Sequence, residues 1–151
     1  MMGWQHTALN LSVFAPLAGL GVWAGQDQVV LAVGAGYLIG TLYVTPDLDL
    51  PLNDAARRWG PLRFIWVPYH RLSRHRGMSH TYVLGPLIRL LYLAVLMWPL
   101  VALFRPEIDT GRAAQVLAGY LASQWLHLLA DGYWPVGRRP RRTLAKRTSA
   151  P

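Results

Sequence analysis

The sequence predicts an all-α membrane protein: a polytopic helical bundle with four transmembrane helices and an interfacial loop between the second and third helices. Hydrophobic residues make up 53% of the 151 residues, whereas only 7 residues are acidic. Four long apolar runs follow one another along the chain, and the basic residues gather in two of the segments that connect or follow them. A soluble bundle would need a polar outer face on each helix, and the first two runs have almost none.

The four apolar runs cover residues 7–25, 29–44, 81–104 and 113–134. Three of them reach the ~18–20 residues that are needed to cross a bilayer. The second run is shorter but carries no charge, and its Gly36 and Gly40 form a small-x-x-x-small pair that predicts close packing against a neighbouring helix. A cleaved signal peptide is the alternative for the first run, but no Lys or Arg precedes its apolar part.

The basic residues predict how these helices are oriented. Of the 15 basic residues, 12 lie in the loop after the second run or in the tail after the fourth: Arg57, Arg58, Arg63, Arg71, Arg74, Arg76, Arg138, Arg139, Arg141, Arg142, Lys146 and Arg147. Four spans place this loop and this tail on the same side, which the positive-inside rule assigns to the cytoplasm. We therefore predict a multi-pass protein of the bacterial cytoplasmic (inner) membrane with both termini in the cytoplasm. Anionic membrane lipid is the expected partner of the charge, and no nucleic acid is expected.

The chain is expected to form one four-helix transmembrane domain over residues 1–137 and a basic, disordered cytoplasmic tail over residues 138–151. Prolines and glycines interrupt the loop at 48–79, which also mixes Arg with Trp, Phe and Tyr. This composition predicts a segment that lies in the membrane interface with its aromatic rings among the lipid headgroups. The chain has no Cys, which excludes disulfides, thiolate zinc sites and Cys nucleophiles.

Histidine and acidic residues gather at the cytoplasmic ends of all four runs. They are His6, Asp47, Asp49, His75, His80, His127 and Asp131. Pro46 and Pro51 disfavour helix in the residues that precede them, so the PDLD segment is expected to be extended, with both of its carboxylates on one side. Such convergence predicts one polar site at the cytoplasmic face.

Helix geometry places further residues at this site. Tyr120, Gln124, His127 and Asp131 form one polar stripe on the last run, and such a stripe must face protein or water. Gly77 lets the chain turn between His75 and His80. Ser79 is expected to cap the third span, which places His80 in the first turn of that helix.

Imidazole and carboxylate ligands without sulfur are typical of a hydrolytic Zn²⁺, Mn²⁺ or Fe²⁺ centre, and zinc is our first choice. Seven candidates exceed the four ligands of a tetrahedral zinc, so we expect one or two ions. Asp47, Asp49, His80 and His127 form the expected inner set, completed by His6, His75 and Asp131. Each residue alone has a structural interpretation, as a hydrogen-bonded imidazole or a turn aspartate. We interpret His70 as structural or lipid-facing, and Arg89 as facing the bundle or snorkelling rather than clamping a substrate.

Several of these motifs resemble a known group. His6, PDLD after the second run, HR-x-x-SH before the third and His-x-x-x-Asp in the last are similar to those of the YdjM-like, membrane-bound metal-dependent hydrolases. The block RRWGPLRFIWVPYHRLSRHRGMSH is similar to a related bacterial family of metal-binding membrane proteins. The resemblance implies a small polytopic membrane protein whose metal is bound by the seven residues named above.

We therefore predict a metal-dependent hydrolase at the cytoplasmic membrane face, in which metal-activated water attacks an amphiphilic ester, with a lipid phosphate as the first candidate. Asp49 or Asp131 would accept the proton of that water. The alternative is a non-catalytic metal-binding, metal-sensing or structural membrane protein with a closed coordination sphere. A metal or proton transporter is a third class, which is disfavoured because the ionisable residues crowd one face rather than the bilayer midplane.

Overall fold

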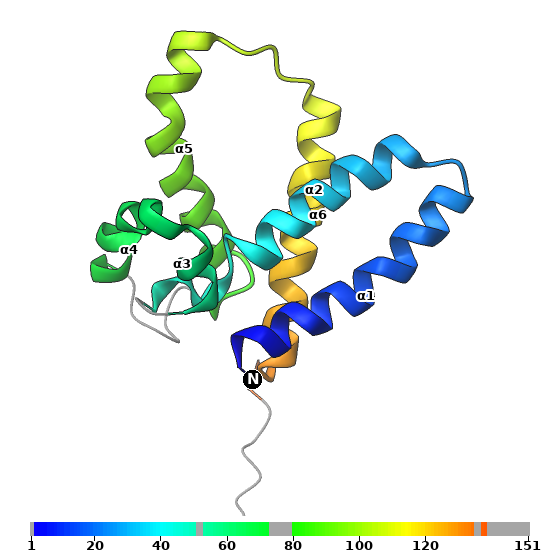
Figure 1. Cartoon of the computed structure of the whole chain (residues 1–151), viewed down its shortest axis with the longest axis horizontal. Helices are drawn as coiled ribbons and strands as arrows, with labels where there is room; N and C mark the ends of the chain where they lie inside the picture. Colours follow the sequence, from blue (N-terminus) through cyan, green and yellow to red (C-terminus); the bar gives the residue numbers. More distant parts are fainter. Residues whose placement is uncertain (1, 51–52, 73–79, 135–136, 139–151) are drawn as a thin grey trace, which may run out of the picture.

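The computed structural model describes residues 2–50, 53–72, 80–134 and 137–138, and this part of the chain is mostly helical (Figure 1). It contains α1 (Gly3–Trp23), α2 (Asp27–Leu42), α3 (Asp54–Arg58), α4 (Val67–Leu72), α5 (Leu84–Phe104) and α6 (Thr110–Ala130). Two 3₁₀ helices, η1 (Pro46–Asp49) and η2 (Gly60–Trp66), lie before α3 and α4. The predicted helical class is confirmed, and the four long helices α1, α2, α5 and α6 coincide with the four apolar runs.

The first two helices form an antiparallel hairpin that leads the chain onto α6. Gly25 ends the turn after α1 with φ +71°, a conformation that side chains with a Cβ rarely adopt. α2 then crosses α6, and α1 runs antiparallel to α2 and contacts α6 (Figure 1). The N-terminal end of α1 and the C-terminal end of α6 therefore meet at one end of the bundle.

The crossing of α2 and α6 brings the two backbones into direct contact. A Cβ on Gly36 would lie 1.8 Å from the carbonyl oxygen of Val116, and a Cβ on Gly119 would lie 1.9 Å from that of Val33. Only glycine fits at these two positions, because any larger residue would force the helices apart. Gly40 continues the contact, since its Cβ would meet the Ser123 hydroxyl oxygen at 2.1 Å. The close packing predicted from Gly36 and Gly40 is confirmed.

α5 makes far fewer contacts than α2 and α6. It diverges from α6 along its length, and the two are joined through residues 105–109 at their far ends (Figure 1). Its apolar side chains are exposed, including Leu91 at 61%, Trp98 at 68% and Leu103 at 72%. Among the described helices, the segments Asp27–Asp49 and Leu84–Phe104 are long and apolar enough to cross a membrane. The 21 residues of α5 extend about 31 Å, close to the ~30 Å hydrocarbon thickness of a bilayer.

The segment from η1 to α4 folds into a small aromatic core at the base of α5. Trp66 is fully buried, and its ring lies 5.7 Å from that of Tyr69 and 5.5 Å from that of Tyr92 on α5. The expectation that the aromatic rings of this loop all lie among lipid headgroups is therefore wrong for Trp66 and Tyr69. Phe64 remains exposed, because it lies on the outer side of η2. Packing against α5 removes these large rings from the surface of the protein.

A short hairpin follows α6 and was not predicted. β1 (Tyr133–Trp134) pairs with β2 (Gly137–Arg138) in antiparallel register. The predicted boundary between the transmembrane domain and the tail falls within this hairpin, and residues 139–151 of that tail lie outside the described residues. The Tyr82 hydroxyl donates a hydrogen bond of 2.7 Å to the Tyr133 carbonyl. This contact ties the segment before α5 to the end of α6.

Candidate metal centre

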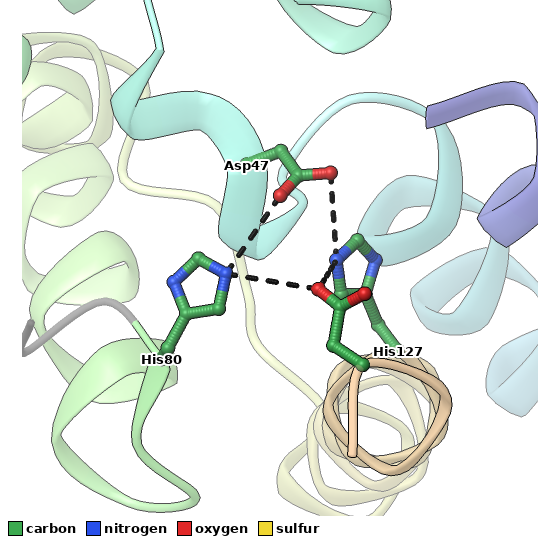
Figure 2. A group of neighbouring side chains, drawn as sticks. Asp47, His80 and His127 are labelled. Carbon is green, nitrogen blue, oxygen red and sulfur yellow. Dashed lines mark ion pairs between the residues drawn. The ribbon is translucent and has the colours of Figure 1, made fainter. Parts of the chain in front are cut away.

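Four side chains from three distant segments converge at the end of the bundle where the N-terminal end of α1 meets the C-terminal end of α6. Asp47 lies on η1, His80 lies just before α5, His127 lies in the last turn of α6, and Asp131 follows that helix. Each offers one donor atom, and the four atoms all lie within 4.8 Å of one another. Figure 2 shows Asp47, His80 and His127 pointing toward a common point from their separate elements. The structure thus brings together four of the seven predicted site residues.

The distances between these donors suit a shared cation better than direct hydrogen bonds. His127 Nε2 lies 3.5 Å from Asp47 Oδ2 and 3.8 Å from Asp131 Oδ2. His80 Nε2 lies 3.7 Å from Asp47 Oδ1 and 4.0 Å from Asp131 Oδ2. Tetrahedral zinc with bonds near ~2.0–2.2 Å separates its ligand atoms by about 3.3–3.6 Å. A contraction of this cluster would therefore place its donor atoms at distances that one ion can bridge.

A buried nitrogen that makes no hydrogen bond supports the same interpretation. His127 Nε2 is buried and has no hydrogen-bond partner in the described part of the chain. Buried polar atoms are normally hydrogen-bonded, and an exception requires a physical reason. A cation held between His127 and the two facing carboxylates supplies that reason, because the imidazole nitrogen would donate its lone pair to the metal. Two imidazoles and two carboxylates are a donor set that zinc, manganese and iron accept.

The local fold of the PDLD segment separates its two aspartates. Residues 46–49 form the 3₁₀ helix η1 rather than the expected extended strand. With three residues per turn, side chains two positions apart point about 120° away from each other instead of to one side. Asp47 therefore faces the cluster, whereas Asp49 is buried (4% exposed) and is not one of the four grouped donors. Asp49 as a ligand stays a prediction.

Asn53 fixes the shape of η1 and was missed by the sequence reasoning. Its side-chain amide donates hydrogen bonds to the carbonyl oxygens of Asp47 and Leu50, and its Oδ1 accepts one of 2.7 Å from the amide of Ala56. It therefore acts as the N-cap of α3 while it holds the turn that carries Asp47. An Asn directly before the helical DAARR stretch is the signal that could have identified it.

His6 lies beside the four donors rather than among them. Its Nε2 lies 3.0 Å from Asp131 Oδ1, which leaves Asp131 Oδ2 facing the cluster. Its ring stacks on that of His127, with centroids 3.7 Å apart and planes inclined by 12°. Contacts of this kind orient the residues that bind a metal. The structure thus places His6 where it fixes both His127 and Asp131, and its role as a direct ligand stays a prediction.

His80 reaches the site from a position ahead of its helix. α5 begins at Leu84, so the expectation that His80 lies in the first turn of this helix is wrong. The Thr81 hydroxyl accepts a hydrogen bond of 2.8 Å from the amide of Gly85, and Trp125 Nε1 donates one of 2.9 Å to the Tyr82 carbonyl. These contacts hold the segment against α6 without extending the helix to His80. Ser79 and the predicted ligand His75 lie outside the described residues.

The surroundings of Asp131 lower the pKa of its carboxyl group. Burial raises the pKa of Asp131, but the hydrogen bond from His6 and the charges of His6 and His127 outweigh it and hold the pKa well below its usual range. The group is therefore an anion under ordinary conditions, as a metal ligand must be.

The predicted polar stripe on α6 is confirmed. Tyr120, Gln124 and His127 are each at most 3% exposed, and they all face the interior of the bundle. Arg89, which is fully buried, donates a hydrogen bond of 2.9 Å from Nη2 to Gln124 Oε1 and one of 3.4 Å from Nε to the Tyr120 hydroxyl. The interpretation of Arg89 as a bundle-facing residue is confirmed. Through these contacts it joins α5 to α6.

A cavity of about 340 Å³ opens beside the four donors. Asp47, His127 and Asp131 form part of its wall, and α1, α2 and α3 supply most of the remainder. Asn10, Thr41 and Ser123 also line it, and the sequence reasoning missed all three. Asn10 follows His6 by one helical turn on α1, so the same-face rule that grouped the residues of α6 could have found it.

The fold and the site together define a helical metal-binding protein in which histidine and aspartate ligands from separate segments meet at one end of the bundle. The chain belongs to the family described as "Uncharacterized metal-binding protein (DUF2227)", which matches residues 2–109. This match includes Asp47 and His80 but ends before His127 and Asp131, so the structure adds the second half of the donor group.

A similar protein occurs in Aquifex aeolicus (strain VF5), where it is named only as an uncharacterized protein. The two are 48% identical over 60 residues, which are 40% of this chain and 43% of the relative. The chain thus matches less than half of that relative's length. No solved structure matches the chain.

Proposed function

We propose that this protein is an integral membrane metal-dependent hydrolase that acts at the cytoplasmic membrane face on an amphiphilic ester, with a lipid phosphate as the first candidate. The observation that carries the proposal is the position of the donor group at the wall of the cavity. A purely structural metal site is closed, whereas a catalytic site keeps an open position for water or substrate. Here three of the four donor residues line the cavity. The resemblance to the YdjM-like hydrolases supports the metal more strongly than the reaction.

Asp47, His80, His127 and Asp131 would hold the metal, with zinc as the first choice and manganese or iron as alternatives. When bound, such a metal lowers the pKa of a coordinated water and polarises an ester oxygen. The side chains must keep their donor atoms fixed and deprotonated for this purpose. His6 contributes by orienting Asp131 through a hydrogen bond of 3.0 Å and by stacking on the His127 ring.

Asp131 is better placed than Asp49 to accept a proton during the reaction. It lines the cavity, and its two carboxylate oxygens face His6 on one side and the donor group on the other. His6 donates a hydrogen bond to Asp131 and keeps its carboxylate ionised, so the group carries no proton when the reaction begins. Asp49 is not among the described residues that line the cavity, so we assign the base to the pair of Asp131 and His6.

Exposed apolar surface supports a membrane position for the helices. Leu17, Leu20 and Trp23 on α1 are between 60% and 86% exposed, and α5 shows a similar surface. Soluble monomers rarely expose apolar area on this scale, whereas lipid satisfies it. We propose that α1, α2, α5 and α6 all cross the bacterial inner membrane, with cytoplasmic termini and with the basic residues facing anionic lipid.

This topology can be tested with single cysteines, because the chain has none of its own. A cysteine at Gln26, between α1 and α2, should react with a membrane-impermeant maleimide in intact cells. A cysteine at Arg57, whose side chain is 71% exposed, should react only after the cells are permeabilised. Labelling of Arg57→Cys in intact cells would contradict the proposed orientation.

The main experiment measures metal bound to the detergent-purified full chain. We expect about one or two zinc, manganese or iron ions per chain, and loss of metal in Asp47→Ala, His80→Ala and His127→Ala. His70→Ala serves as the matched control, because His70 lies in α4 outside the donor group. Metal-free wild-type protein, or equal metal in all variants, would overturn the proposed site.

Hydrolysis is then measured on phospholipid vesicles and on a panel of soluble phosphate and carboxylate esters. Metal-dependent turnover that disappears in His127→Ala would support the hydrolase. Stoichiometric metal without turnover of any of these esters would instead favour the non-catalytic alternative, a metal-sensing or structural membrane protein.

A further inference from the structure

The walls of the cavity beyond the metal donors are polar. Among the described residues that line it, Leu50 is the one large aliphatic side chain. An acyl chain would therefore find almost no apolar surface in this space. Its volume of about 340 Å³ also lies at the lower end of the ~300–1,000 Å³ range of small-molecule sites. The cavity is thus suited to a small polar group.

Two buried oxygens on this wall have no hydrogen-bond partner in the described part of the chain. They are Oδ1 of Asn10, a residue that is 1% exposed, and Oγ1 of Thr41, a residue that is 5% exposed. Burying a polar atom without a partner is unfavourable. A ligand that offers hydrogen-bonding groups here would remove that cost. Both residues line the cavity, so such a ligand would be next to the metal centre.

The contacts of Asn10 fix which of its amide atoms is available. Its Nδ2 donates a hydrogen bond of 3.0 Å to the His6 carbonyl, so Oδ1 is left as an acceptor. The Tyr37 hydroxyl donates one of 3.2 Å to the Asn10 carbonyl, which ties α1 to α2 at this level. Thr41 lies one turn beyond Tyr37 on the same face of α2. Its hydroxyl can both donate and accept a hydrogen bond.

The charges around the cavity disfavour an additional charged group. Asp47 and Asp131 would together offset a divalent cation. Asp54 and Arg58 also line the cavity and add one negative and one positive charge, which cancel. Arg58 is also engaged by the backbone, since its Nη1 donates a hydrogen bond of 3.0 Å to the Leu42 carbonyl at the end of α2. A neutral group that donates and accepts hydrogen bonds, namely a hydroxyl, matches this wall best.

We propose that this cavity binds the alcohol portion of the substrate and that this portion is a small hydroxyl-bearing headgroup of the size of glycerol. One ligand hydroxyl donates to Asn10 Oδ1 and accepts from the Thr41 hydroxyl, while the ester group faces the metal centre. The proposal rests on the proposed function and names the substrate class for that same site.

Binding of three probes tests the proposal on the zinc-loaded, detergent-purified full chain by calorimetry. The probes are inorganic phosphate, glycerol 3-phosphate and phosphoethanolamine, which differ in the group attached to the phosphate. We expect glycerol 3-phosphate to bind about five- to thirtyfold more tightly than inorganic phosphate, the effect of one or two hydrogen bonds. Phosphoethanolamine adds a cationic group to the phosphate. We expect its gain in binding free energy over inorganic phosphate to be less than about half of the gain of glycerol 3-phosphate.

Variants at the two oxygens locate the preference. Thr41→Val keeps the side-chain shape but removes the hydroxyl, and Asn10→Leu removes the amide. Each should reduce the preference for glycerol 3-phosphate to about twofold or less while binding of inorganic phosphate changes little. Thr41→Ser should keep the preference. Ser12→Ala is the matched control on α1, because the Ser12 hydroxyl is exposed and donates to the Leu9 carbonyl.

Several results would overturn the inference: wild-type protein that binds all three probes equally or none of them, tighter binding of phosphoethanolamine, or variants that weaken every probe by the same factor. Zinc content is measured on the same samples. A preference for glycerol 3-phosphate in protein that holds no metal would support the proposed headgroup site and contradict the proposed hydrolase. Metal-loaded protein without the preference would contradict the proposed headgroup site and leave the proposed hydrolase standing.

Discussion

The crossing of α2 and α6 and the long helix α5 are held in place by opposite means. At the crossing, glycines bring two backbones into contact, and polar side chains such as Gln124 are buried between the helices. α5 instead exposes most of its apolar surface and is joined to α6 through the buried Arg89. The first arrangement leaves the helices little freedom, whereas the second depends on a few hydrogen bonds and on the surroundings of α5.

This difference divides the metal centre into two parts. Asp47 follows α2, and His127 and Asp131 belong to the end of α6, so the α2–α6 crossing fixes three of the four donors. His80 alone arrives with the segment that leads into α5. Damage to the crossing should therefore affect the whole protein, whereas damage to the attachment of α5 should affect the contribution of His80.

The largest effect is expected from Gly36→Ala. The added Cβ would meet the Val116 carbonyl oxygen, so the helices must separate, and we expect a loss of about 2 kcal/mol or more in the free energy of unfolding. Thermal unfolding in detergent measures this loss. Gly19→Ala is the control, because a Cβ there meets no atom within 4 Å and alanine favours helix. Equal stability of the two variants would show that the crossing is not close-packed.

Arg89→Met should have the next largest effect, and it should act through His80. The change keeps the apolar stem of Arg89 but removes the hydrogen bonds to Gln124 and Tyr120, which should loosen α5. We expect about a tenfold loss in metal affinity. In the double variant with His80→Ala the two losses should not add, because both remove the same ligand. Fully additive losses would show that Arg89 does not act on metal binding through His80. Arg112→Met, at an exposed position, is the control.

His6→Phe should weaken metal binding by up to about tenfold without changing the number of ions bound. Phenylalanine keeps an aromatic ring next to His127 but cannot donate a hydrogen bond to Asp131. Metal titration followed by elemental analysis measures both affinity and stoichiometry. A fall from two ions to one would instead identify His6 as a direct ligand of a second metal.

The smallest effect is expected from Asn53→Ala, which removes the N-cap of α3 and should cost about 1 kcal/mol in the free energy of unfolding. Asp109→Ala removes the N-cap of α6 and should cost a similar amount. Only Asn53→Ala should also lower metal affinity, because only Asn53 holds the turn that carries Asp47. Thermal unfolding and metal titration of the two variants, side by side, separate these effects.

The ends of the helices show which features of the structure can be predicted from the sequence and which cannot. The polar stripe of α6 and the glycine pair of α2 were predictable, because side chains four residues apart share a helix face whatever surrounds them. The PDLD segment was assigned the wrong conformation, because the rules for residues before proline do not distinguish an extended strand from a 3₁₀ turn that Asn53 holds through its side chain. His80 was placed inside a helix that begins only at Leu84, after contacts with Trp125 and Tyr133 that lie far along the chain.

The sequence by itself determined the four apolar helices, the two segments that carry most of the basic residues, and the supply of imidazole and carboxylate groups near the helix ends. These features depend on local composition and on helix periodicity, which neighbouring residues specify. Only the tertiary structure decided that Asp47, His80, His127 and Asp131 share one point, that Asp49 is not one of these four grouped donors, and that His6 contacts Asp131 and His127 beside them. Those outcomes depend on contacts between residues that are distant in sequence, above all on two helices that approach as closely as glycine allows.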